Sequence, residues 1–338
     1  WWSIFLDSRL NHFFILGANK KPIMLTSLLG IKYPIIMAPM FLVSDEEMVI
    51  AAGNAGITGA IPALNWRTIE QLKTGINNIK SKSKAPFGIN LIVNKSNIKY
   101  KEQLKTICNL GVDYIITSLG NPKETIEAAR ENGVKVFCDV TDLKYAHKVQ
   151  ELGADAIIAV NSNAGGHAGK IPRNELIELL KNEIEIPIIS AGGVGNSTQL
   201  KETMDLGVAG CSIGSIFIAS SESPVSAEYK QACVDYGKDD IVMTTKLSGT
   251  PCTVINTPYV EEIGTKQGFM EGILNKNKQL KKWAKMLTFY KGMKSLEKAA
   301  FSATYKTVWC AGPTIENTTE IKPINEIVAH LVKDLKSE

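Results

Sequence analysis

From Pro34 onward, short apolar runs alternate with longer amphipathic stretches. Each apolar run is only a few residues long, and most are rich in Ile and Val, which is typical of strands buried on both faces. The runs are Pro34–Ala38, Gly56–Ala60, Phe87–Ile92, Tyr114–Thr117, Val134–Cys138, Ala156–Val160, Pro187–Ser190 and Gly210–Ile213. The alternation therefore predicts eight strands in a parallel sheet.

The stretches between these runs space their apolar residues as helices do. They are Ser44–Asn54, Thr68–Lys80, Asn97–Leu110, Pro122–Asn132, Leu143–Leu152, Asn174–Lys181 and Ser197–Leu206, and glycine follows several of them, at positions 111, 133, 153 and 207. Glycine just past the last helical residue is the expected C-cap. Eight strands alternating with helices favour an α/β protein with a (β/α)8 TIM-barrel fold. The alternative is a doubly wound open sheet, but no G-x-G-x-x-G follows the first strand.

The regular alternation ends near Ser220, which suggests a division of the chain. We assign residues 24–220 to the barrel. Residues 221–320 are more polar and less regular, with a Lys-rich helical stretch at Asn275–Tyr290, and we expect a mostly helical appendage that covers the barrel mouth. Residues 321–338 are expected to form a closing helix. We interpret residues 1–23 as an artefact or an over-extended start of doubtful native status.

Composition and charge exclude several functional classes. The chain has 338 residues, of which 44% are hydrophobic, and its glycines show no fixed period, so it is neither disordered nor fibrous. The net charge of +4 is scattered apart from the stretch Lys276–Lys285 and predicts no nucleic-acid partner. No apolar run reaches membrane-spanning length.

The cysteine pattern indicates a reducing compartment. The six cysteines lie far apart with no C-x-x-C pair, so we expect a cytoplasmic protein without disulfides, and no cluster of metal ligands is present. The exposed apolar positions expected for a barrel with an appendage are compatible with a monomer or a homodimer.

Candidate chemistry is concentrated after the predicted strands, because barrel enzymes place their active sites at the C-terminal ends of the strands. Glycine-rich turns after the seventh and eighth strands expose backbone N–H groups, and a helix N-terminus favours negative charge. Gly192, Gly193, Gly214 and Ser215 are therefore the candidates for holding a phosphate. His167 follows two glycines after the sixth strand, and its imidazole can transfer protons near neutral pH.

The roles of two further polar residues, Asn90 and Asp139, can be interpreted in more than one way. Asn90 could bond to a flat heterocycle or to ribityl hydroxyls, or it could satisfy a buried loop. Asp139 could be a base, an acceptor for a cofactor or an ion-pair partner of a lysine. Hydrolase chemistry receives little support, because the sequence contains no Gly-x-Ser-x-Gly elbow and no evident Cys–His pair.

Five segments in order give a specific resemblance. They are Leu28–Met40 (LLGIKYPIIMAPM), Pro86–Asn90 (PFGIN), Ala164–Gly169 (AGGHAG), Ile189–Gly193 (ISAGG) and Ser212–Ser215 (SIGS). Together they resemble the nitronate monooxygenase family, formerly the 2-nitropropane dioxygenases, from about Leu25 to the C-terminus. The chain departs from the family pattern at Val160 and Ser212, where glutamine is frequent, and it lacks an arginine after the Gly-Gly-His motif.

The resemblance implies a TIM barrel with non-covalent FMN at its mouth. The flavin contacts of the family fall on Ala38, Pro39, Met40, Asn90, Gly165, Gly193, Ser212, Ile213, Gly214 and Ser215. We add Gly192 from the phosphate argument and Gly166 from the glycine pair before His167. The catalytic histidine of the family falls on His167, as a base or as a group that orients the substrate.

The implied reaction is FMN-dependent oxidation of alkyl nitronates, or nitroalkanes, by O2 to a carbonyl compound and nitrite. One alternative is an FMN-dependent NAD(P)H reductase of quinones or enoyl thioesters. Another is a flavin-binding protein without catalysis.

Overall fold

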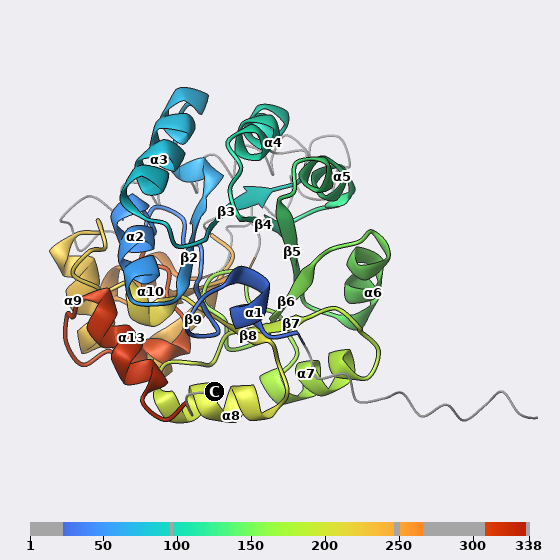
Figure 1. Ribbon diagram of the computed structural model, residues 1–338. Helices are drawn as coiled ribbons and strands as arrows, with labels where there is room; N and C mark the ends of the chain where they lie inside the picture. Colours follow the sequence, from blue (N-terminus) through green and yellow to red (C-terminus); the bar gives the residue numbers. More distant parts are fainter. Residues whose placement is uncertain (1–22, 95–96, 247–250, 266–307, 336–338) are drawn as a thin grey trace, which may run out of the picture.

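The computed structural model describes residues 23–94, 97–246, 251–265 and 308–335. Eight parallel strands form a closed barrel, in which each strand pairs with the next and the eighth pairs with the first (Figure 1). The strands are β1 (Ile35–Met37), β2 (Thr58–Pro62), β3 (Phe87–Ile92), β4 (Tyr114–Ser118), β5 (Lys135–Val140), β6 (Ala156–Val160), β7 (Ile188–Ala191) and β8 (Gly210–Ile213). This closure confirms the predicted (β/α)8 TIM barrel and excludes the open sheet.

Capping residues mark the ends of several of the helices that connect the strands. They are α2 (Glu46–Asn54), α3 (Ile69–Lys82), α4 (Tyr100–Asn109), α5 (Lys123–Glu131), α6 (Leu143–Glu151), α7 (Arg173–Lys181) and α8 (Ser197–Asp205). Thr68 and Gln71 form a capping box at the start of α3. The four predicted C-terminal glycines (111, 133, 153 and 207) all have positive φ, between 58° and 87°.

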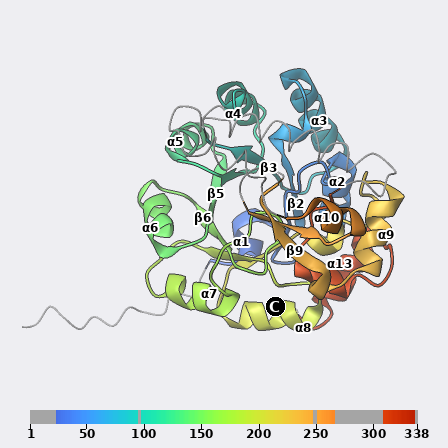
Figure 2. The same cartoon turned by 180° about the vertical axis from the view of Figure 1, so that it is seen from behind.

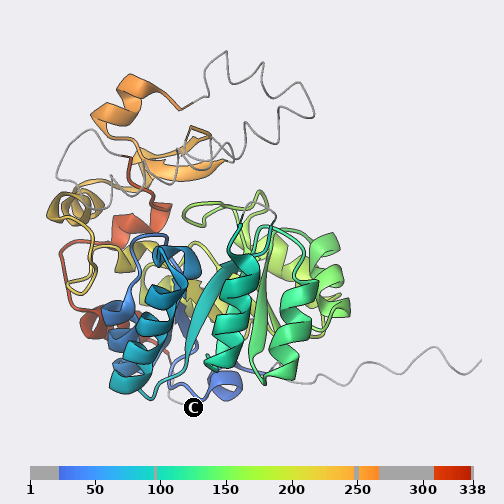
Figure 3. The same ribbon diagram turned by 90° about the horizontal axis from the view of Figure 1, so that it is seen from above.

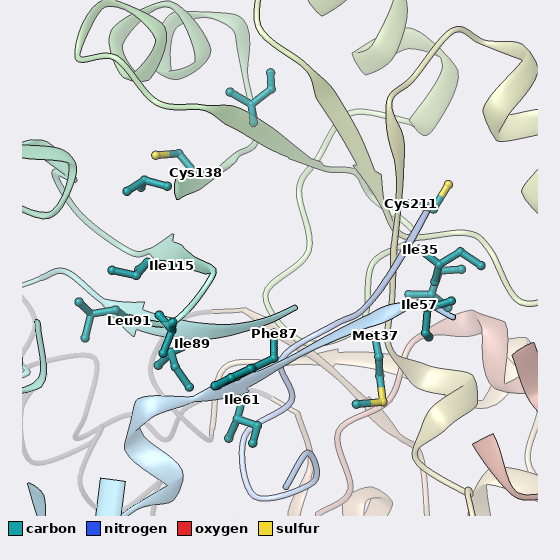
Figure 4. Close-up of a cluster of buried hydrophobic side chains, with 14 of the residues drawn as sticks. Ile35, Met37, Ile57, Ile61, Phe87, Ile89, Leu91, Ile115, Cys138 and Cys211 are labelled. Atoms are coloured by element: carbon teal, nitrogen blue, oxygen red, sulfur yellow. The ribbon is translucent and has the colours of Figure 1, made fainter. Parts of the chain in front are cut away.

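Apolar side chains fill the barrel in two layers. The outer layer, between strands and helices, contains Ile35, Met37, Ile89 and Leu91, part of which Figure 4 shows. The inner layer fills the barrel itself. There Tyr114 stacks on Phe137 with ring centroids 4.9 Å apart.

Gly88 makes room for the ring of Tyr114, because a Cβ at Gly88 would lie 2.2 Å from that ring. The interior is therefore a packed core, as is usual for barrels of this kind.

The two ends of the barrel are covered by different parts of the chain, as the opposite views in Figures 1 and 2 show. The short helix α1 (Leu25–Leu29) closes the end at which the strands begin. Leu25 is fully buried there, and its N–H donates to the carbonyl of Ala209 over 2.9 Å. In Figure 3 the chain that follows β8 lies over the opposite end.

The chain after β8 contains helices and a small sheet. The described part holds α9 (Ala227–Asp235), β9 (Ile241–Thr244), β10 (Cys252–Ile255), α10 (Pro258–Ile263) and the 3₁₀ turns η3 (Lys238–Asp240) and η4 (Pro313–Asn317). The antiparallel pair β9–β10 was not among the predicted elements. The predicted Lys-rich helix at Asn275–Tyr290 lies outside the described residues.

The last helix, α13 (Ile324–Val332), packs against α2 and α8. Its buried residues Ile324, Val328 and Leu331 join the outer layer of the barrel core. Among the described helices, none is long and apolar enough to cross a membrane.

Candidate active site

A pocket of about 810 Å³ opens at the C-terminal ends of the barrel strands. This volume lies in the range of small-molecule and cofactor sites. Every site residue predicted from the sequence lines it: Ala38, Pro39, Met40, Asn90, Gly165, Gly166, His167, Gly192, Gly193, Ser212, Ile213, Gly214 and Ser215. The fold thus brings segments from β1 to β8 to one cavity. Ile213 packs its side chain into the outer core layer, so it offers the pocket main-chain atoms.

The loop after β7 is held against the loop after β6. Gly192 has a φ of +106°, and a Cβ there would lie 2.5 Å from the backbone nitrogen of Ala164. Asn161, which is almost fully buried, donates from Nδ2 to the carbonyl of Gly192 over 3.0 Å. Its Oδ1 accepts from the backbone N–H of Asn163 over 2.8 Å. Asn161 is therefore a positioning residue that the sequence analysis did not single out.

The turn after β8 differs from the expected strand–helix junction. A 3₁₀ turn, η2 (Ser215–Phe217), follows β8 instead of an α-helix. Of the two loops predicted to hold a phosphate, the loop after β7 therefore leads into an α-helix, α8, and the loop after β8 does not. The hydroxyl of Ser215 accepts a hydrogen bond of 2.9 Å from the backbone N–H of Gly312.

Three polar side chains on neighbouring strands form a chain inside the barrel mouth. Asn90 on β3 donates from Nδ2 to the hydroxyl of Ser118 on β4 over 2.7 Å, and to the carbonyl of Ile116 over 3.1 Å. The hydroxyl of Ser118 donates to the carboxylate of Asp139 on β5 over 2.5 Å. Burial raises the pKa of Asp139 to about 6, although the bond from Ser118 opposes the shift.

These hydrogen bonds decide against one of the three roles considered for Asp139, that of an ion-pair partner of a lysine. In the described structure its carboxylate is held by a hydroxyl and forms no ion pair with a lysine. Asp139 therefore fixes Ser118, which in turn fixes the amide of Asn90 at the pocket wall.

His167 lines the pocket wall, and its side chain stays open to the pocket. Partial desolvation by the surrounding wall lowers the pKa of its imidazole below the usual value of 6.5, because the charged form loses solvation. The imidazole is therefore neutral at neutral pH and able to accept a proton.

The preceding residue, Gly166, connects this loop to β10. Its N–H donates to the hydroxyl of Thr253 over 2.8 Å, and its carbonyl accepts from the N–H of Thr253 over 3.0 Å. The loop that carries His167 is thus attached to the chain segment after the barrel.

The outer wall of the pocket comes from residues that the sequence analysis missed. They are Tyr229, Cys252, Val308, Cys310, Ala311 and Thr314. Tyr229 stacks on Trp309 and donates from its hydroxyl to the carbonyl of Cys310 over 2.5 Å. No local motif marks these positions, since their neighbours in space are distant in sequence.

Comparison with known proteins agrees with this architecture. The family model described as "Nitronate monooxygenase" matches residues 23–334. A "Probable nitronate monooxygenase" of Staphylococcus saprophyticus is 27% identical over 283 residues, which cover 70% of this chain and 79% of the relative. A (3aS,4S,5R,7aS)-5-hydroxy-7a-methyl-1-oxo-octahydro-1H-indene-4-carboxyl-CoA dehydrogenase of Mycobacterium tuberculosis is 29% identical over 260 residues, covering 75% of this chain and 72% of the relative.

Solved structures show the same fold. FabK from Thermotoga maritima superposes with a TM-score of 0.79 at 27% identity and covers 91% of this chain and 94% of its own. The nitroalkane oxidase from Streptomyces ansochromogenes superposes with a TM-score of 0.77 at 21% identity, covering 92% of this chain and 97% of its own, and supports the fold alone. Because the family model spans the barrel and most of the chain that follows it, this protein belongs to the nitronate monooxygenase family and is an oxidoreductase.

Proposed function

We propose that this protein binds FMN in the barrel-mouth pocket and oxidises alkyl nitronates with O2 to a carbonyl compound and nitrite. The observation that carries the proposal is the meeting of His167, whose lowered pKa keeps it neutral, with the glycine-rich loops after β7 and β8 in one pocket of about 810 Å³. The reaction itself is inferred from the family.

The residues present suit a flavin. The pocket is large enough for the isoalloxazine ring and the ribityl chain. Asn90 offers an amide whose orientation is fixed by Ser118, and Ser212 and Ser215 offer hydroxyls next to Gly214. We assign Gly192, Gly193, Gly214 and Ser215 to the phosphate, with the N-terminus of α8 nearby. Ala38, Pro39, Met40, Gly165 and Gly166 would line the remainder of the cofactor site.

When bound, FMN supplies the redox chemistry, accepting electrons from the substrate for transfer to O2. The protein supplies position and proton control. His167 holds the nitronate against the cofactor, or accepts the proton from the α-carbon of a nitroalkane. Thr253 keeps the backbone of the His167 loop in place through its two bonds to Gly166.

An anaerobic titration tests the proposal. The purified protein is loaded with FMN, and propyl nitronate and NADH are added separately while the flavin absorbance is followed. Bleaching by propyl nitronate but not by NADH is the expected result. A protein that binds no flavin, or a flavin that neither reagent bleaches, contradicts the proposed activity.

The role of His167 is tested with the His167→Asn variant. General acid–base catalysis contributes about 10²–10⁴-fold, so we expect a loss of this order in kcat/KM with a neutral nitroalkane. The loss should be smaller with preformed nitronate, from which the proton is already gone. Equal losses with both substrates would assign His167 to orientation only, and unchanged turnover would remove it from the mechanism.

A second candidate is NAD(P)H-dependent reduction of quinones or enoyl thioesters. It is favoured by the similarity to FabK at 27% identity and to a carboxyl-CoA dehydrogenase at 29% identity. Bleaching by NADH or NADPH alone in the same titration would identify this activity.

Two further expectations belong with the proposal. A cytoplasmic location is expected because all six cysteines are free thiols. Assembly into a homodimer is a prediction that sedimentation of the purified protein can test.

A further inference from the structure

Two cysteines far apart in sequence meet at the outer wall of the pocket. Cys252 is the first residue of β10, and Cys310 forms an antiparallel bridge with Val254 two residues further along that strand. Because side chains alternate along a strand, Cys252 and Val254 point to one face, and the cross-strand partner Cys310 shares it. Both cysteines line the pocket.

The two thiols also interact chemically. The two side chains lie close enough to influence each other's ionisation. Interaction with the Cys310 side chain lowers the pKa of Cys252 below its usual value, against the effect of burial. The same interaction and burial raise the pKa of Cys310. The pair thus combines a more readily ionised thiol, Cys252, with a neighbouring thiol, Cys310, that stays protonated.

The other four cysteines lack these features. Cys108, Cys138, Cys211 and Cys233 are buried, and burial raises the pKa of each. None of them lines the pocket. They provide internal controls with the same chemistry in an unreactive environment.

We propose that Cys252 and Cys310 form an oxidisable thiol pair, in which hydroperoxides that enter the pocket oxidise Cys252 and Cys310 resolves the product to a disulfide. In the first step the Cys252 thiolate attacks the outer oxygen of ROOH, the O–O bond breaks, and ROH leaves after taking up a proton. In the second step the sulfur of Cys310 displaces hydroxide from the Cys252 sulfenic acid, and the thiol proton completes a water molecule. Two thiols lose two electrons, and one peroxide gains them.

The location connects this oxidation to the active site. Thr253, the residue after Cys252, makes both hydrogen bonds to Gly166, and Gly166 precedes His167. Tyr229 binds the carbonyl of Cys310 from the other side. A bond between the two sulfurs would therefore change the spacing of two segments, β10 and the chain at Cys310, that hold the His167 loop and the pocket wall.

Mass spectrometry of the full chain tests the proposal without reference to activity. The protein is reduced, desalted, exposed to stoichiometric hydrogen peroxide and alkylated under denaturing conditions. We expect two of the six cysteines to escape alkylation, a peptide that joins Cys252 to Cys310, and full reversal by dithiothreitol.

Two variants separate the roles of the sulfurs. Cys310→Ser should retain a sulfenic acid at Cys252 that dimedone labels, because the resolving thiol is gone. Cys252→Ser should slow peroxide oxidation of Cys310 by about tenfold or more, since the activated sulfur is absent. Cys138→Ser, the control, should form the disulfide as the wild type does.

If one of the two variants fails to fold, the other still tests the proposal: Cys310→Ser through dimedone labelling of Cys252, and Cys252→Ser through the rate of Cys310 oxidation. Full alkylation of both cysteines after peroxide treatment overturns the proposal. A disulfide that involves Cys108, Cys138, Cys211 or Cys233 also overturns it, as does equal dimedone labelling at those positions.

Discussion

The buried carboxyl group of Asp139 makes the stability of the fold depend on pH. Burial raises its pKa from 3.8 to about 6. Between about pH 4 and 6 the folded protein therefore holds a proton that the unfolded chain has released, and this group lowers stability as the pH rises through that interval. Above it, the buried charge remains an unfavourable contribution.

We expect Asp139→Asn to be more stable than the wild type above pH 6, by about 3 kcal/mol for a shift of two pKa units. The amide oxygen still accepts the bond from Ser118. The advantage should shrink as the pH falls toward 4 and disappear below 3.8, where the wild-type carboxyl becomes protonated in both states. Urea unfolding of both proteins across this range measures it, and a difference that does not vary with pH would contradict the assignment.

Gly192 has a positive φ that other residues rarely adopt, and its surroundings leave no room for a Cβ atom. Gly192→Ala places a Cβ 2.7 Å from Oδ1 of Asn161 and also pays for its positive φ. We expect FMN to bind at least about tenfold more weakly, because the displaced loop is assigned to its phosphate. Gly207→Ala is the matched control, since Gly207 has a φ of +86° and nothing within 4 Å of its Cβ.

Fluorescence titration with FMN compares the two variants. Equal losses of affinity in both would mean that general destabilisation, and not the shape of the β7 loop, controls cofactor binding.

At this scale the sequence predicts where some pocket residues lie and misses others, for a physical reason. The glycine loops and His167 were predictable because each lies directly after a strand, and barrels bring strand ends together. The fixed amide of Asn90 was not, because its partners Ser118 and Asp139 lie on two other strands. Cys252 and Cys310 carry no local signal, because only the folded chain brings them together.

Among the elements, β10 determines how the His167 loop is held. The hydroxyl of Thr253 satisfies the N–H of Gly166, and an unsatisfied buried N–H costs about 1–3 kcal/mol. Thr253→Val keeps the shape of the side chain but removes this acceptor. We therefore expect nitronate turnover to fall by about tenfold, as the loop relaxes from its position.

Thr318→Val is the control for this measurement. The buried hydroxyl of Thr318 has no hydrogen-bond partner in the described part of the chain, so its removal should leave stability unchanged or improved. Steady-state kinetics and thermal unfolding of both variants make the comparison. An unchanged kcat in Thr253→Val would show that the backbone bond alone holds the loop.

The barrel elements were predictable because each combines a buried run with an amphipathic helix nearby in sequence. The pair β9–β10 was not, because two short antiparallel strands stand outside the regular strand–helix alternation on which the prediction rests. Its stability derives from contacts with Gly166 and Trp309, which local periodicity does not reveal.

For the whole molecule, the barrel separates stability at one end from chemistry at the other. Leu25→Ala opens a cavity beneath the barrel, and we expect a loss of about 2–5 kcal/mol in the free energy of unfolding. FMN affinity should not change, because the pocket lies at the opposite end.

Leu179→Ala, at a position that is 38% exposed, is the matched control and should have a small effect. Urea unfolding and FMN titration report the two quantities separately. A parallel loss of both in Leu25→Ala would show that the ends are coupled.

The bond between Ser215 and Gly312 also sets an order of events during synthesis. The two residues are 97 positions apart, and at typical elongation rates that distance takes roughly 5–20 s to translate. During this interval the eight strands have been synthesised, whereas Gly312 and its neighbours in the outer wall have not. We expect the apolar side chains at the barrel mouth to stay uncovered until that wall is made, so that the mouth is most open before the chain is complete.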